Sequence, residues 1–207
     1  MAWTAPRTWV TGETVTAALM NAHVRDNLLE TSAATATTAG DIVYADAANS
    51  MGSRLGIGSA TGTHLASTGS APVWRSVGSM IGDASYGAII ETSFDDFDNL
   101  GNGTGTNVTV TVTTGTRAIV FYGARSVANA TAGANVQISY RVSGATTTAA
   151  AVNWGTVFES TAANDAGDAG RMDFATLTAG SNVFTLQGFV STGTGTIGRP
   201  YIAVLPF

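Results

Sequence analysis

The chain has 207 residues, with nine Lys and Arg residues against fourteen Asp and Glu residues, two His and no Cys, which gives a formal net charge of -5. This length suits one or two domains with a sizeable core, and the lack of cysteine excludes a disulfide-stapled secreted scaffold. All nine basic residues are Arg and are spread singly along the chain, so no basic patch is formed for nucleic acid.

The chain shows no signal for membrane insertion. Its first residues lack the apolar stretch of a signal peptide, and no window approaches the roughly 18 apolar residues of a membrane span. We therefore expect a soluble protein that is made in a cytoplasm and has no membrane partner.

Residues 11–32 have a helical pattern. Ala17, Met20, Val24 and Leu28 recur at spacings of three and four and form one apolar stripe, and Thr14 or Thr16 is a suitable N-cap. Because nucleation is costly, so short a helix with so narrow a stripe is marginal alone. We expect the stripe to pack on a partner.

Residues 33–80 contain too few large apolar side chains for a core of their own. A small-residue connector, 33–40, leads into short apolar groups at 42–44, 55–57 and 72–74, separated by Gly, Ser and Asn. Such a segment is stable only if neighbouring chains bury these side chains together.

From about residue 85 the hydrophobic period changes to two, which predicts strands. The predicted strands are 87–92, 107–112, 117–127, 135–142, 152–159, 171–175, 182–190 and 196–205. Turn signals, among them 164–168 and 179–182, separate them, and no helix-length pattern intervenes. The C-terminal part is therefore predicted to be an antiparallel β-sandwich or jelly roll, with a core supplied by Trp154, Phe158, Phe174, Phe184, Phe189 and Tyr201.

The first 75 residues resemble bacteriophage proteins. The segment WVTGETVTAALMN at 9–21, continued by VRDNLL at 24–29, is similar to the N-termini of tailed-bacteriophage tail-fibre and minor tail proteins. The groups GDIVY (40–44), LGIG (55–58), GTHL (62–65) and APVW (71–74) resemble a unit of phage fibre shafts. The stretch LTAGSNVFTL (177–186) is similar in general style to the β-sandwich heads of such fibres.

The resemblance implies a homotrimer, in which three copies complete what one lacks. The residues expected around the axis are Met20, Val24, Leu28, Tyr44, Leu55, Ile57, Leu65 and Trp74. A monomer whose helix packs on its own sandwich is the alternative. Trp3 and Trp9 are expected to dock another virion protein, or else to pack on the helix.

Residues that could carry chemistry are few. His23 and His64 have no second His at ligand spacing, and no nucleophile motif is present, so neither a hydrolase nor a zinc site is supported. Asp95, Asp96 and Asp98 are weak candidates for calcium, because EF-hand spacing fails at Leu100 and Asn107. We expect a solvated loop there, no metal and no cofactor. Trp154, which is expected in the core like the other aromatic residues, is also a candidate sugar-stacking or interface residue that could contact a receptor.

Together these observations predict a mainly β protein with an N-terminal helix, residues 1–32 as an anchor, 33–80 as a short β-rich trimeric stalk and 81–207 as the sandwich head. The expected function is a non-enzymatic fibre on the virion that adheres to a host-surface glycan or protein. One alternative is a capsid fibre or decoration protein that stabilises the shell. Another is a glycan depolymerase, which needs two carboxylates facing across a cleft.

Overall fold

The computed structural model describes residues 7–29, 35–47, 53–56, 63–68, 70–81, 85–98 and 106–207. The chain divides into two compact units, residues Met1–Trp74 and Arg75–Phe207. The predicted boundary between stalk and head, at residues 80 and 81, falls inside the second of these units. Trp3 and Ile57, two of the predicted contact residues, lie outside the described residues.

The predicted helix is present but begins later than expected. It runs through α1 (Ala17–Met20), a π-helical turn η1 (Asn21–Arg25) and α2 (Asp26–Leu29). Thr16 is the N-cap, and its hydroxyl accepts from the Leu19 backbone N–H at 3.3 Å. Residue 11 cannot start the helix because Gly12 has a φ of +85° in a preceding turn, in which Glu13 N donates to Val10 O.

Two small strand pairs follow in the chain. β1 (Ile42–Tyr44) pairs antiparallel with β2 (Ser53–Leu55), and β3 (Thr63–Ser67) pairs with β4 (Pro72–Ser76). Asp41, next to β1, accepts from Arg54 Nη1 at 2.8 Å and from the backbone of Thr37 and Thr38. One carboxylate therefore ties a turn to the neighbouring strand, which gives the aspartate of the GDIVY segment a structural role.

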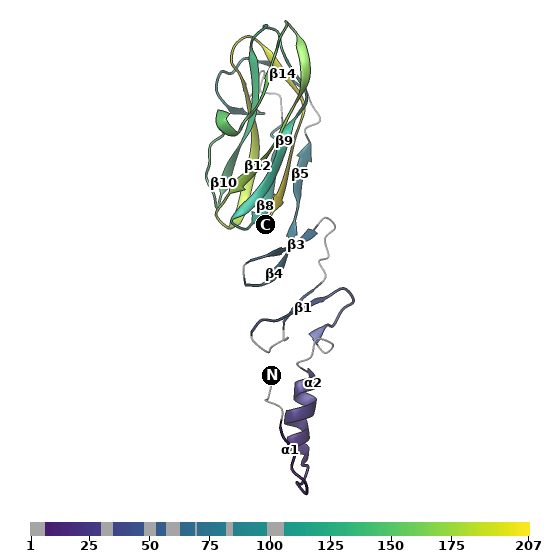
Figure 1. Cartoon of the computed structure of the whole chain (residues 1–207). Helices are drawn as coiled ribbons and strands as arrows, with labels where there is room; N and C mark the ends of the chain where they lie inside the picture. The colour runs from purple at the N-terminus through teal and green to yellow at the C-terminus, as the bar shows by residue number, and fades with distance from the viewer. Residues whose placement is uncertain are drawn as a thin grey trace. The chain divides into compact units, whose positions relative to one another are not determined.

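The second unit is built from two five-stranded antiparallel sheets, whose strands run from β5 to β14 in chain order and are in part labelled in Figure 1. One sheet has the order β11–β10–β13, with β7 and β8 both pairing with β13; the other has the order β12–β9–β14, with β5 and β6 both pairing with β14. The bounds are β5 (Gly78–Ile81), β6 (Ser85–Ile89), β7 (Asp95–Asp96), β8 (Thr109–Thr114), β9 (Arg117–Asn129), β10 (Asn135–Gly144), β11 (Thr156–Glu159), β12 (Asp165–Thr176), β13 (Gly180–Val190) and β14 (Gly195–Pro206).

The fold class is confirmed: the protein is mainly β, with two antiparallel sheets packed as a sandwich. Each predicted strand has a counterpart, but β5 and β7 were missed because they are short and carry few branched side chains. Two predicted turns were wrong in part, because β12 already begins at Asp165 and β13 at Gly180. Before β12, the turn needs only Asn164 as its left-handed residue, with a φ of 61°.

The core lies between the two sheets and comes entirely from the second unit among the described residues. Tyr122, Phe97 and Phe184 are its largest fully buried side chains, while Trp154 and Phe158 pack against it from its margin. Phe174 was predicted to be a core residue, and this was wrong: it is 64% exposed, because alternation along β12 turns it to the opposite face from buried Ala175.

Candidate functional site

A pocket opens beside Trp154, the residue predicted to contact a receptor. It has a volume of about 230 Å³. It is lined by Tyr140, Val142, Thr148, Trp154, Asp173, Phe174, Ala175, Thr176 and Leu177. These residues come from β10 in one sheet, β12 in the other, and the segment between β10 and β11, so the pocket lies at an open edge of the sandwich.

The segment that carries Trp154 is fixed by side chains from three strands. It forms a single 3-10 turn, η2 (Val152–Trp154). Ser139 Oγ donates to Ala151 O at 3.2 Å, the Tyr122 hydroxyl donates to Trp154 O, and Arg171 Nη1 donates to Gly155 O at 3.0 Å. The indole is thus held by backbone contacts on either side of it, which lowers the entropy cost of stacking a ligand on it.

A carboxylate completes the pocket. Asp173 Oδ2 accepts from the Tyr140 hydroxyl at 2.6 Å, and Oδ1 accepts from the Phe174 backbone N–H at 2.9 Å. Burial, followed by the bond to Asp173, raises the pKa of Tyr140, and burial raises the pKa of Tyr122 to about 12. Both phenols therefore stay neutral, and the pocket offers an aromatic wall, one carboxylate and threonine hydroxyls.

Such a set of groups suits a sugar ring. The C–H face of a sugar packs on an aromatic ring, while its hydroxyls donate to carboxylate oxygens. The volume is below the roughly 300–1,000 Å³ of drug-sized sites, so the pocket fits one small ring rather than a long chain. Sequence reasoning had singled out Trp154 as a candidate but not Tyr140 or Asp173, because nothing in the pattern of β10 or β12 shows that their side chains meet.

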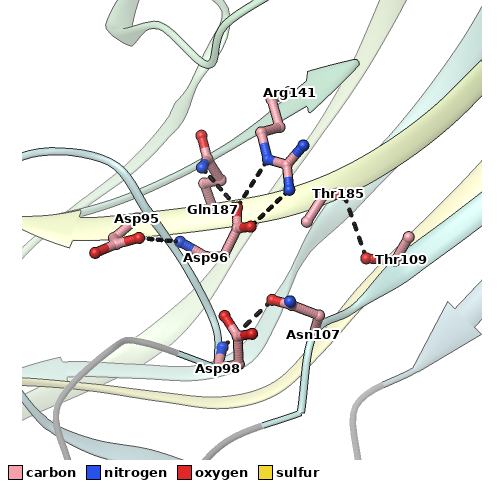
Figure 2. Close-up of polar contacts among 8 residues, drawn as sticks. All are labelled: Asp95, Asp96, Asp98, Asn107, Thr109, Arg141, Thr185 and Gln187. Carbon is pink, nitrogen blue, oxygen red and sulfur yellow. Dashed lines mark hydrogen bonds and ion pairs between the residues drawn. The ribbon is translucent and has the colours of Figure 1, made fainter. Parts of the chain in front are cut away.

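The acidic segment around β7 is engaged in a structural contact. Asp96 Oδ1 and Oδ2 accept from Arg141 Nε at 2.9 Å and Nη2 at 2.6 Å, and Gln187 Nε2 also donates to Oδ1 at 2.6 Å, as Figure 2 shows. The Arg141 hydrogen bonds are the main cause that lowers the pKa of Asp96, against the effect of burial. This carboxylate therefore fastens β7 onto β13 and β10.

The other two aspartates make separate local contacts. Asp95 Oδ1 accepts from Asp96 N at 2.8 Å, and Asp98 N donates to Asn107 Oδ1 at 3.3 Å (Figure 2). In the part of the chain that the structure describes, no three His, Cys, Asp or Glu side chains gather closely enough to hold a metal ion.

The predicted anchor and interface residues are uncovered in the single chain. Met20, Val24 and Leu28 are 43%, 39% and 60% exposed, and Trp9 is 42% exposed. Trp9 contacts the His23 ring edge-on, with Arg7 over its own face. Trp9 thus packs partly on the helix and still presents much of its ring to solvent.

The predicted stalk residues are likewise incompletely covered. Leu65 is 51% exposed, and Tyr44, Leu55 and Trp74 are half-buried. Trp74 Nε1 donates to Gly56 O at 2.6 Å, which connects β4 to the end of β2.

Comparison with known proteins gives a likeness of fold only. No family model matches the chain, and no curated protein matches it. Among solved structures, the Eiger TNF of S. frugiperda is 9% identical, with 64% of this chain and 92% of that chain covered at a TM-score of 0.44. A CBM35 from Cellvibrio japonicus Abf62 is 15% identical, with 61% and 92% covered at a TM-score of 0.30. At these values the likeness says nothing of what this chain binds.

Helices among the described residues are too short or too polar to cross a membrane.

Proposed function

We propose that this chain is a non-enzymatic fibre protein of a tailed-bacteriophage particle, which assembles as a homotrimer and adheres to the host surface. Residues 1–32 attach it to another virion protein, the following segment up to Trp74 forms a short trimeric stalk, and the sandwich is the exposed head. The receptor is a host-surface glycan, for which the Trp154 pocket is the contact.

One observation carries this proposal. In the described part of the first unit, no hydrophobic side chain is buried, although a capped helix and two strand pairs are formed there. Elements of this size are marginal without tertiary packing. Regular structure without a core of its own supports burial by other copies of the chain, as the resemblance to phage fibres implies.

The head supplies the adhesive part of the proposal. A pocket that accepts one sugar ring gives a weak single site, and three copies on one fibre raise the effective affinity through multivalency. The proposal therefore needs no deep cleft in the sandwich.

The experiment is a competition for adsorption. Purified full-length chain is added to the bacterium that the particles infect, and particle adsorption is measured, with antibody labelling of the chain on intact particles. We expect the chain to reduce adsorption and the label to mark the tail. Antibody label on the capsid would support the decoration alternative. Absence of label from the particles, together with no binding of the chain to cells, would contradict the proposal. New reducing ends released from host polysaccharide would show a depolymerase instead.

A further inference from the structure

The sandwich has an apolar outer face of its own, separate from the helix and the stalk. On the sheet β12–β9–β14, the side chains of Phe121, Met172 and Phe174 are 43%, 48% and 64% exposed. Their strand neighbours Val120 and Tyr122 are fully buried on the opposite side. Alternation therefore places large apolar groups on both faces of this sheet, which is typical of a sheet covered on both sides.

The strand register makes these side chains one contiguous patch. Phe174, Ile119 and Leu205 are paired across the three strands, and the next outward row consists of Met172, Phe121 and Ala203. Neither row contains a charged residue. A cluster of this kind on a soluble protein marks an interaction site more often than a free surface.

An open groove continues the patch along the strands. Tyr201 extends over Gly123 and Gly170, since a Cβ added at these glycines would lie 2.9 Å and 2.5 Å from its hydroxyl oxygen. The groove has a volume of about 910 Å³ and reaches Arg125, Arg199 and Asp168. An aromatic ring and two glycines thus separate the apolar rows from a charged row.

Two features of the charged row, which consists of Arg125, Arg199 and Asp168, are unfavourable for the stability of the single chain. Arg199 lies opposite Arg125, between the ladder pairs Gly198–Ser126 and Pro200–Ala124, and like charges across a strand pair are unfavourable. Arg199 also has a φ of 49°, a left-handed conformation that is uncommon for arginine. Among the described residues none of Arg125, Arg199 and Asp168 forms a salt bridge.

The position of Asp168 gives the face complementary charge. Asp168 lies at the bulge of β12, on one side of the face, and the two arginines lie on β9 and β14. These opposite charges lie on different strands of the face and form no salt bridge within the described part of the chain, so the Asp168 side of one copy can meet the arginine side of the next. A head-to-tail contact of this kind closes into a ring when the rotation is right.

We propose that this outer face of Ile119, Phe121, Met172, Phe174, Ala203 and Leu205 is covered by further copies of the same chain. Asp168 of one copy then pairs with Arg125 or Arg199 of the next. The copy number rests on the proposed function, in which three chains assemble, whereas the face itself is argued from the sandwich alone. Two rows of phenyl, thioether and aliphatic groups favour a protein surface over a polar sugar.

The test uses the absence of cysteine from the chain. M172C places a single thiol on the proposed face, and T111C is the matched control, since Thr111 is an exposed residue on β8 of the other sheet. Reaction with a maleimide is followed on the full-length assembled chain and again after dissociation in denaturant. We expect the M172C thiol to react at least about tenfold more slowly than the T111C thiol in the assembly, and at a similar rate after dissociation.

Two outcomes contradict the inference, and the mass of the same samples separates them. If the M172C and T111C thiols react at equal rates in a sample with the mass of three copies, the proposed trimer stands but this face is not covered by the other copies. The mass of one copy would contradict both the face and the proposed assembly. As a second check, Phe121→Asp is added to M172C and, separately, to T111C. Because the charge should open the face, we expect the M172C thiol to react faster and the T111C thiol to react at an unchanged rate.

Discussion

The Tyr140 hydroxyl donates to Asp173 Oδ2 at 2.6 Å, and this bond joins β10 in one sheet to β12 in the other. Tyr122, whose ring is edge-on to Tyr140 at 5.1 Å, donates to the backbone of Trp154. Two neutral phenols thus stabilise the wall of the proposed sugar pocket from inside the core. Loss of their protons would remove these hydrogen bonds and reduce the stability of the sandwich.

Alkaline titration should detect this coupling. Burial raises the pKa of Tyr122 to about 12, above its value of about 10 in an unfolded chain, so its contribution to stability is complete below pH 10 and is lost between about pH 10 and 12. We expect the difference in phenolate absorbance between the native chain and Tyr122→Phe to appear near pH 12. A difference signal near pH 10 with the protein still folded would contradict the buried position of this phenol.

Asn182 should be among the most sensitive polar positions. It is fully buried, its Nδ2 donates to Thr114 Oγ1 at 2.7 Å and to Thr178 O at 2.9 Å, and its Oδ1 accepts from Thr146 N at 2.7 Å. Asn182→Ala leaves these groups unpaired and should reduce the free energy of unfolding by about 3 kcal/mol. Ser181→Ala, at the exposed adjacent position, should change it by no more than about 0.5 kcal/mol in the same denaturant titration.

Low pH should remove the stability that the Asp96–Arg141 contact contributes around β7. Since hydrogen bonds from Arg141 lower the pKa of Asp96, its contribution to stability is present above the pKa of an unfolded aspartate and is lost as pH falls through the lower, folded value. Asp96→Asn should therefore be less stable than the native chain at neutral pH, and the difference should shrink in acid. Glu159→Gln, at an exposed residue, is the control. A difference independent of pH would argue against the ion pair.

Removal of the indole should abolish adhesion while the fold is kept. Trp154 is half-buried at the margin of the core, so Trp154→Phe retains an aromatic wall and Trp154→Ala removes it. If the pocket binds a sugar, the alanine variant loses competition with particle adsorption and the phenylalanine variant retains part of it. Circular dichroism checks the fold of both. If the alanine variant still competes fully, the receptor contact lies elsewhere on the head.

A charge exchange tests the pairing proposed across the outer face. Asp168→Arg places a third positive charge beside Arg125 and Arg199. Self-association should therefore weaken, and the chain concentration at which half of the assembly dissociates should rise at least about tenfold. Adding Arg199→Asp restores opposite charges, and aspartate tolerates the left-handed backbone of that position. We expect the double variant to regain part of the association. If it associates no better than Asp168→Arg alone, the pairing is wrong.

The sequence was sufficient for the parts that depend on local patterns. Strict alternation in β8, as in Val110 and Val112, and the capping threonine before α1 both predict structure from neighbouring residues. The pocket partners Tyr140 and Asp173 could not be found in this way, because they meet only through the packing of two sheets. Phe174 shows the same limit: an aromatic residue on a strand does not reveal which face of the sheet it occupies.

The central claim is that the first unit, whose described residues bury no hydrophobic side chain, is completed by other copies of the same chain. The helix stripe tests one part of it: Met20→Asp with Val24→Asp should leave the sandwich folded and weaken association, since both side chains are exposed in the single chain.

The most direct measurement is the solution mass of the full-length chain by light scattering across a range of concentrations. The account predicts the mass of three 21.0 kDa chains. A single 21.0 kDa particle at every concentration, with the helix and strand pairs of the first unit still protected from proteolysis, would contradict it.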